Sequence, residues 1–579
     1  MDLASTLKSV LNFKDTASIM HIRVLCLFLA LFVTAAPNIL FISIDDLNDW
    51  IGCLGGHPQT KTPNLDAFAA RSTLFTNAHC AAASCNPSRT AVMTGISPHR
   101  SGLYENGQRM RDVLPDATLL PQFFRNHGYW AGGSGKLLHY FIDARSWDSY
   151  FPDKETENPF PRTLYPETRP LSLPRGGPWQ YGETDWGPLP ATDEEYGGDY
   201  LVSEWIGAQL NRKHYKPFFL ACGIYRPHEP WFVPAKYFEP FPLDSIQLPA
   251  GFREDDLDDL PPAGKRRGPN RYFAHIRAHK QWKQALQGYL ASIHFADAML
   301  GRVLDSLAAS PHAKNTIVAL WSDHGWHLGE KQHWQKFSAW RVCSRVPLIV
   351  HVPPKLSQAL PAGTQPGIST RPVDLLSLYP TLLQLAGLPP NPACDGPSLL
   401  PLLRSPQSEW PHVGITHLGE PGSLGLSADR FRYIRYANGD EELYDIANDP
   451  HEWTNLAPNP EYAPTLTKLR ARAPAEFAKK PTTKASALPS LRVSPRPGPP
   501  SKPDGNPFDV LFINHHEHAV ELFWVDSEGK TRSYGQLEPG ARKNQQTRPG
   551  AVWQFANSAT REVLGHITVG DRRARVGLK

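Results

Sequence analysis

Residues 37–46 read PNILFISIDD, a mostly apolar run that ends in two adjacent carboxylates. A short apolar run with a proline before it and charge after it is typical of a buried strand. The pattern recurs in PFFLACGIY, NTIVALWSD and VPLIVHVP, with helical patterns between them in TPNLDAFAARS, TLLPQFFRNHG, YLASIHFADAMLGRVLDSLAAS and VDLLSLYPTLLQLAG. This alternation predicts an α/β fold whose mostly parallel sheet is sandwiched by helices.

The remaining sequence predicts further parts, because 579 residues exceed what one ordinary core holds. The predicted parts are an export signal at 1–36, the α/β domain at 37–400, a small α+β subdomain at 401–478, a proline-rich linker at 479–506 and a separate all-β sandwich at 507–579. The linker is too poor in apolar residues for us to expect it to pack. A net charge of +4 argues against a nucleic-acid partner.

The segment MHIRVLCLFLALFVTAA resembles a secretory signal, with a short basic lead, an apolar run at 24–33 and small residues at its end. Met20 is then a possible true start. The run is shorter than the roughly 20 residues that span a bilayer, although a membrane anchor remains the alternative. We therefore expect a secreted or periplasmic protein with no membrane span after signal removal.

Two pairs of polar side chains follow predicted strands. Asp45 and Asp46 follow NILFISI, and Asp323 and His324 follow NTIVALWS. Adjacent carboxylates repel unless a cation joins them, so these pairs predict a site for a hard divalent metal at the carboxyl ends of the strands. The alternative is that each aspartate only caps a helix or a turn.

The run CNPSRTAVMTG at 85–95 resembles the signature of the sulfatase family, and TPNLDAFAARSTLFTNAH resembles the stretch that precedes it there. The resemblance implies an alkaline-phosphatase-like fold and oxidation of Cys85 by a formylglycine-generating enzyme. The hydrate of formylglycine has two hydroxyls on one carbon, so one attacks sulfur and the other then expels sulfate as the aldehyde re-forms. The resemblance to the sulfatase family also implies one divalent cation, Ca²⁺, held by Asp45, Asp46, Asp323, His324 and the residue at position 85.

The same resemblance assigns further catalytic residues. Arg89 would hold the diol, on the same side as Cys85 if a helix starts at Pro87. GKLLH supplies Lys136 and His139, which share a face if that segment is helical. RPHEPW supplies His228, and GEKQHWQKFS supplies Lys336. Lys136 and Lys336 would contact the sulfate, His139 would take the proton that drives sulfate release, and His228 would assist the leaving oxygen.

His324, SDHGWHLGE, WQKFS and ELYDIANDPHEWTNLA look most like the iduronate-2-sulfatase branch, which implies a sulfated sugar or polysaccharide as substrate. One alternative is a phosphate or phosphonate monoester hydrolase on the same scaffold. The other is a non-catalytic protein that binds a sulfated glycan or a peptide.

Residues 510–555 resemble the β domain of the von Hippel-Lindau protein, which binds hydroxyproline in a peptide. Trp524, Tyr534, Thr547 and Trp553 fall at positions that line its pocket, but Ala551 replaces a histidine that holds the hydroxyl. An aromatic groove for another peptide or a glycan is one interpretation. The other is a stability module whose tryptophans fill a small sandwich.

Overall fold

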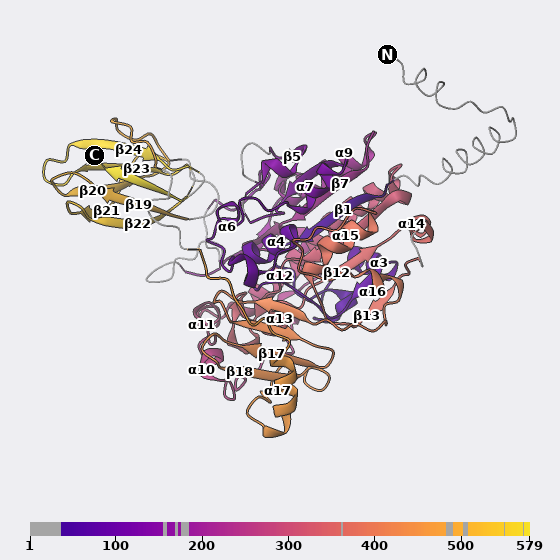
Figure 1. Cartoon of the computed structure of the whole chain (residues 1–579). Coiled ribbons are helices and arrows are strands. Elements are labelled where there is room, and N and C mark those ends of the chain that lie inside the picture. The colour runs from indigo at the N-terminus through magenta and orange to yellow at the C-terminus, as the bar shows by residue number, and fades with distance from the viewer. Residues whose placement is uncertain are drawn as a thin grey trace, which may run out of the picture.

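The structure is a computed structural model that describes residues 36–139, 141–153, 159–167, 172–174, 184–359, 363–481, 490–501, 508–548, 550–570 and 573–578. The predicted export signal lies outside these ranges, except for residue 36. Within the described ranges, no helix has both the length and the apolar character needed to cross a membrane. The described chain forms a large body with a separate β domain beside it (Figure 1).

An eight-stranded sheet forms the centre of the large body, in the order β13-β2-β12-β9-β1-β7-β4-β5. Its strands are β1 (Asn38–Ile44), β2 (Thr73–Phe75), β4 (Trp130–Gly135), β5 (Ser149–Phe151), β7 (Phe218–Ile224), β9 (Thr316–Ser322), β12 (Leu348–His351) and β13 (Gly367–Ser369). All neighbours pair in parallel except β12, which runs antiparallel to β2 and β9. The predicted mostly parallel sheet is confirmed.

Both faces of the sheet are covered by helices. Leu40 and Ile42 of β1 join one buried cluster with α3 (Pro63–Ala70), α9 (Asp199–Asn211) and α12 (Trp282–Ala309). Ile39 and Phe41 point the other way, into a second cluster with α4 (Cys85–Thr94), α7 (Leu120–Asn126), α15 (Leu378–Leu385) and α16 (Leu400–Arg404). Successive residues of a strand face opposite sides, so the consecutive apolar residues 39–42 of β1 contribute to both cores.

Short elements complete the large body. They are α5 (Pro98–Ser101), α6 (Met110–Val113), α8 (Asp193–Tyr196), α10 (Pro262–Lys265), α11 (Arg271–Ala278), α13 (Arg341–Ser344), α14 (Pro354–Ala359), β3 (Ala78–His79), β6 (Trp186–Leu189), β8 (Trp231–Pro234), β10 (His327–Leu328), β11 (Trp334–Gln335) and β14 (Val373–Asp374). Short 3₁₀ turns connect several of these elements.

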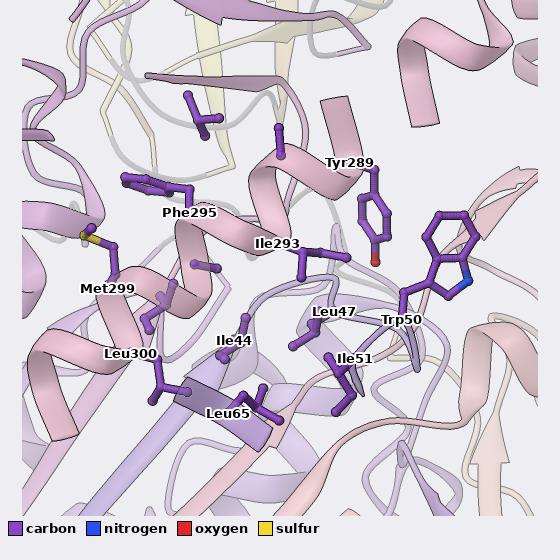
Figure 2. Packing of buried hydrophobic residues seen from close by; sticks show 14 of the residues in the cluster. Ile44, Leu47, Trp50, Ile51, Leu65, Tyr289, Ile293, Phe295, Met299 and Leu300 are labelled. Carbon is purple, nitrogen blue, oxygen red and sulfur yellow. The ribbon is translucent and has the colours of Figure 1, made fainter. Parts of the chain in front are cut away.

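The turn after β1 is fixed by helix α12. Figure 2 shows Tyr289 of α12 beside this turn, together with Leu47, Trp50 and Ile51. The Tyr289 hydroxyl donates to the carbonyl of Asp46 (2.8 Å) and accepts from the Asn48 N–H (3.1 Å). Asp46 has a φ of 57°, a backbone conformation that costs free energy for a residue other than glycine. Packing from a helix far along the chain therefore holds the two carboxylates after β1.

The α+β subdomain contains a four-stranded antiparallel sheet of β15 (Gly414–His417), β16 (Leu424–Ser427), β17 (Phe431–Arg435) and β18 (Glu441–Asp445), followed by α17 (Ala463–Arg470). The two strands predicted in FRYIRY and EELYDI are β17 and β18. The sequence patterns missed β15 and β16, in which Gly414 and Gly425 interrupt the apolar residues.

The C-terminal β domain consists of two sheets, in the orders β22-β19-β25 and β21-β20-β23-β24. The strands are β19 (Phe508–Asn514), β20 (Val520–Val525), β21 (Thr531–Leu537), β22 (Arg542–Thr547), β23 (Val552–Asn557), β24 (Val563–Thr568) and β25 (Ala574–Leu578). The predicted separate all-β sandwich is confirmed.

The expectation that the linker does not pack was wrong for its second half. Ser490 bridges Arg575 of β25, and Ser494 bridges His566 of β24, so one segment joins the edge strands of both sheets. Leu491 and Val493 pack against the core of the sandwich. These two apolar side chains, spaced two apart on an extended segment, provide the packing that overall composition hid.

We predict that Ser501→Ala destabilises the β domain. Ser501 is buried, its hydroxyl donates to the Val525 carbonyl, and it accepts from the Val552 N–H at 2.8 Å. Removing the hydroxyl leaves two buried backbone groups without this partner, which should lower the free energy of unfolding by about 1–3 kcal/mol. Thermal unfolding of the full chain measures this. Ser490→Ala, on the same segment but exposed, is the control, and an equal effect of both changes would contradict the prediction.

Candidate active site

Cys85 is the first residue of α4 and is fully buried. The helix thus begins two residues earlier than Pro87. The Cys85 Sγ lies 3.1 Å from the Lys336 Nζ, 3.2 Å from the His324 Nε2 and 3.8 Å from the Lys136 Nζ. His139 also makes a side-chain hydrogen bond with this thiol. Residues separated by up to 251 positions therefore meet at one sulfur atom.

The three predicted carboxylates are fully buried and each contacts a cation. Arg89 donates to the Asp45 Oδ1 (2.9 Å) and to the Asp323 Oδ2 (2.8 Å), so its guanidinium bridges the ends of β1 and β9. Lys136 pairs with Asp45, and the Lys336 Nζ lies 2.8 Å from the Asp46 Oδ1. Pairing of this kind makes burial of several charges tolerable.

Lys136 and His139 reach the site without the helix that we considered for GKLLH. β4 ends at Gly135, which has a φ of 74°, and the chain then bends. A Cβ on Gly135 would lie 2.0 Å from the Gly223 carbonyl oxygen, so the close approach of β4 and β7 here requires glycine. The bend turns both side chains toward Cys85.

His228 lies in the loop after β7, with its Nε2 3.7 Å from the Asp46 Oδ2. Its Nδ1 lies 2.6 Å from the Glu229 carbonyl, which fixes the ring so that Nε2 faces the site. The ring stacks on Tyr225 at 4.8 Å. All predicted catalytic side chains are thus brought together around Cys85.

The surroundings shift the pKa values of His139 and His228 in opposite directions. Burial lowers the pKa of His139 to about 4, so its imidazole is neutral at neutral pH. Burial also opposes the charged form of His228, but the carboxylates of Asp46 and Asp45 together raise the pKa of His228 above its ordinary value. One histidine is therefore suited to accept a proton and the other to donate one.

Burial alone would raise the pKa of the Cys85 thiol, but Lys136, Lys336 and His324 hold it well below its usual range. The place of Sγ therefore favours a negatively charged atom. A tetrahedral oxyanion with several negatively charged oxygens suits such a place better than a neutral ligand does.

Four of the predicted metal ligands have donor atoms that all lie within 4.8 Å of one another: Asp46, Cys85, Asp323 and His324. Asp45 is outside this group and contacts Arg89 and Lys136 instead. Carboxylate oxygens are the ligands that Ca²⁺ and Mg²⁺ prefer, and an oxygen in place of the Cys85 sulfur would add another. The donor set therefore fits a hard divalent cation.

Sequence patterns missed side chains that hold this arrangement. The Ser88 hydroxyl donates to the Asp323 carbonyl at 2.6 Å, and the Ser322 hydroxyl accepts from the Leu47 N–H at 3.1 Å. With Tyr289 they fix the turns that carry the carboxylates. Ser88 belongs to the CNPSR motif and could have been suspected, whereas Ser322 and Tyr289 carry no local signal.

The loop that carries Lys336 contains a buried carboxyl, Glu330, which accepts from the Leu328 N–H at 2.8 Å. Burial raises the pKa of Glu330 to about 7 from an ordinary value of 4.5. The unfolded chain therefore releases this proton first as the pH rises, and the carboxyl lowers stability progressively between about pH 4.5 and 7.

We predict that Glu330→Gln removes this pH dependence. The free energy of unfolding of the variant, relative to that of the wild type, should rise by about 3 kcal/mol between pH 4.5 and 8. Urea denaturation at several pH values measures the difference. Glu239→Gln, at an exposed position, should give a flat difference. A flat difference for Glu330→Gln as well would show that the carboxyl ionises normally.

In the β domain, the predicted pocket residues pack together. Trp553 is buried and donates its Nε1–H to the Thr547 hydroxyl at 2.8 Å. Tyr534 meets the Trp553 ring edge-on at 4.9 Å. Ala551 is buried, and Trp524 is half-buried on β20 opposite Trp553. This arrangement favours the interpretation of these aromatic rings as core.

Comparison with known proteins places the site in a family. The sulfatase family model matches residues 37–388, more than half of the chain. The chain belongs to the sulfatase family. The model for the C-terminal part of N-sulphoglucosamine sulphohydrolase matches residues 329–478, and that for the VHL beta domain matches residues 501–567. Both resemblances drawn from the sequence are confirmed.

Sequence similarity to individual proteins supports the same family assignment. A sulfatase of Formosa agariphila is 38% identical over 76% of this chain and 86% of its own length. Iduronate 2-sulfatase of Homo sapiens is 30% identical over 70% of this chain and 79% of its own. The solved phosphonate monoester hydrolase of Silicibacter pomeroyi covers 75% of this chain and 94% of its own, with 22% identity and a TM-score of 0.60. This sulfatase thus has the predicted alkaline-phosphatase-like fold. It belongs to an enzyme family that hydrolyses sulfate esters.

Proposed function

We propose that this sulfatase releases sulfate from a sulfated sugar or polysaccharide, with formylglycine derived from Cys85 as its nucleophile. The observation that carries the proposal is the convergence of Lys136, Lys336 and His324 on the buried Cys85 Sγ. Three cationic or ionisable donors around a single thiol suit an anionic substrate. The sugar class is supported by the relatedness to iduronate 2-sulfatase.

The histidines then have opposite roles. His228, whose pKa is raised, would donate a proton to the leaving sugar oxygen. His139, which is neutral, would take the proton of the hydroxyl that remains when sulfate is expelled. Lys136 and Lys336 would bind the sulfate oxygens, and Arg89 would hold the diol. The hydrate of formylglycine would supply both the attacking and the expelling hydroxyl on one carbon.

We propose Ca²⁺ as the metal, held by Asp45, Asp46, Asp323, His324 and the oxygen at position 85. Three carboxylates against one imidazole favour a hard cation over zinc. When bound, the ion would neutralise sulfate oxygens and favour the ionised form of the attacking hydroxyl. Asp45 would have to release part of its contact with Arg89 and Lys136 to join the set.

The proposal also covers the predicted export signal at 1–36 and the C-terminal β domain. Export through the signal at 1–36 would give a secreted or periplasmic enzyme, which would meet its formylglycine-generating enzyme during export. A peptide or glycan ligand at Trp524, Tyr534, Thr547 and Trp553 remains a proposal that burial of Trp553 weakens.

Mass spectrometry tests the nucleophile directly. The tryptic peptide of residues 72–89 contains Cys85 and should be about 18 Da lighter than the unmodified sequence in protein from a host that has the maturation enzyme. An unmodified thiol together with full aryl sulfatase activity would refute the proposal. An unmodified thiol in an inactive protein would favour the glycan-binding alternative, and faster cleavage of aryl phosphate than of aryl sulfate would favour the phosphate or phosphonate esterase.

A further inference from the structure

One strongly basic segment of the α/β domain lies outside the catalytic centre. Between Leu260 and Ala296 the chain has no Asp or Glu, although the five acids Glu254, Asp255, Asp256, Asp258 and Asp259 come just before it. The basic residues of this segment are Lys265, Arg266, Arg267, Arg271, Arg277, Lys280 and Lys283. These seven charges exceed the +4 of the whole chain, so the segment is locally far more basic than the protein.

The first part of this segment lies along the loop that carries Lys336. Asn270 donates from its backbone to the Gln332 carbonyl (3.0 Å) and from its side chain to the Trp334 carbonyl (2.7 Å). Arg267 donates to the carbonyl of Phe337 at 2.8 Å. Phe337 in turn donates its N–H to the carbonyl of Ala83, two residues before Cys85, and Phe337 is 45% exposed. Arg267 therefore contacts the loop that carries Lys336 and borders the segment that leads to Cys85.

The last part of the segment lines a hollow of about 450 Å³ at the start of α12. Arg277, Lys280, Lys283 and Trp282 line this hollow, together with Leu243 and with Asp244 as its one acid. The Trp282 ring is held rigidly, because its Nε1–H donates to the Leu328 carbonyl (2.7 Å) and two phenylalanines pack against it edge-on. A fixed aromatic wall among lysines is suited to a ligand with both a ring face and negative charge.

Six of the seven cations form no ion pair with a carboxylate among the described residues, although Arg266 is close enough to Asp440 to help lower the pKa of Asp440. Within the described part of the chain, Arg277 is the one member of the seven that forms an ion pair, with Glu254 at 2.7 Å. Lys280 and Lys283 are exposed, and Lys283 reaches only a backbone carbonyl. Unpaired cations along one surface attract polyanions and release their counterions on binding.

We infer that the surface from Arg267 to Lys283 binds an extended, sulfated polysaccharide chain whose reacting unit enters the Cys85 site. The inference rests on the proposed function and makes its substrate a polymer. Helix α11 alone is about 12 Å long and lies between Arg267 and Lys280 in the chain, so we expect the hollow at Lys280 and the active-site loop at Arg267 to be too far apart for one sugar unit to contact both. Only a chain of several anionic sugar units can contact both Arg267 and the hollow at Lys280.

Binding is tested without catalysis. The full-length Cys85→Ala protein is titrated with heparin as the probe, over a range of NaCl concentrations. Lys280→Glu with Lys283→Glu should raise Kd about tenfold or more and make the salt dependence shallower. Lys213→Glu with Lys216→Glu, which makes the same charge change at exposed positions elsewhere, should stay within about twofold.

Competition provides the second readout. Heparin should inhibit hydrolysis of a small aryl sulfate by the wild type. Lys280→Glu with Lys283→Glu should raise Ki about tenfold while kcat and KM for the aryl sulfate stay unchanged. Short heparin fragments should inhibit less than long chains and should not distinguish the variant from the wild type.

Equal heparin affinity of the two double variants would overturn the inference, as would equal affinity of the wild type for single-stranded DNA, which would indicate a general polyanion surface. These outcomes are distinct from failure of the proposed function. A protein that hydrolyses no sulfate ester but loses heparin with the Lys280 and Lys283 changes keeps the binding surface and loses the catalytic proposal.

Discussion

Cys85→Ala should abolish sulfate release, with a fall in kcat/KM of about 10⁴-fold or more. Alanine cannot be converted to formylglycine, so the attacking and expelling hydroxyls are both lost. The fold should survive, because Lys136 and Lys336 keep their partners Asp45 and Asp46. Steady-state hydrolysis of a small aryl sulfate measures the effect, on wild-type protein whose peptide mass shows the aldehyde.

The control for this change is Cys53→Ala, which removes a half-buried thiol away from the site and should leave kcat/KM within about twofold. Calorimetry should show the same thermal unfolding for Cys85→Ala as for the wild type. A Cys85→Ala protein that keeps more than about 1% of the activity would place the nucleophile elsewhere.

Asp323→Asn should have the second large effect, and it should appear in stability as well as in activity. Asp323 accepts from the Arg89 Nε at 2.8 Å and from the Asp46 N–H at 3.1 Å, with no exposure to water. An amide removes half of the negative charge around a fully buried guanidinium. Loss of a partner from a buried ion pair costs about 3–5 kcal/mol, so Tm should fall by several degrees.

The same change should empty the proposed calcium site. Elemental analysis after dialysis should find less Ca²⁺ in the variant than in the wild type, and kcat/KM for an aryl sulfate should fall about 10³-fold. Added Ca²⁺ should restore wild-type protein treated with chelator but not the variant. Asp305→Asn, on the exposed side of α12, is the matched control. Unchanged calcium content in Asp323→Asn would exclude Asp323 as a ligand.

The sequence indicated which residues form the candidate site more completely than it indicated which side chains hold those residues in place. Asp45, Asp46, Asp323 and His324 follow strands, and strand ends of a parallel sheet meet at one edge, so their convergence follows from topology alone. The hydroxyl of Tyr289 that holds Asp46 comes from the first third of helix α12, 243 residues away. Such contacts depend on the packing of whole elements, which no local pattern encodes.

Two further differences have the same origin. GKLLH was compatible with a helix, but the close approach of β4 and β7 at Gly135 imposes a bend instead. The linker has the composition of an unpacked chain, yet Leu491 and Val493 find the core of the sandwich. In both cases a partner distant in sequence decides the conformation, and a window of a few residues does not contain that partner.

Complete burial of Cys85 determines whether its oxidation comes before or after folding. A modifying enzyme must contact the thiol, and in the folded protein no part of that thiol reaches the surface. Conversion of Cys85 to formylglycine, as we propose it, therefore has to precede closure of the sheet. A molecule that folds first keeps an unconverted Cys85, so the fraction of active enzyme in a preparation would depend on the relative rates of folding and oxidation.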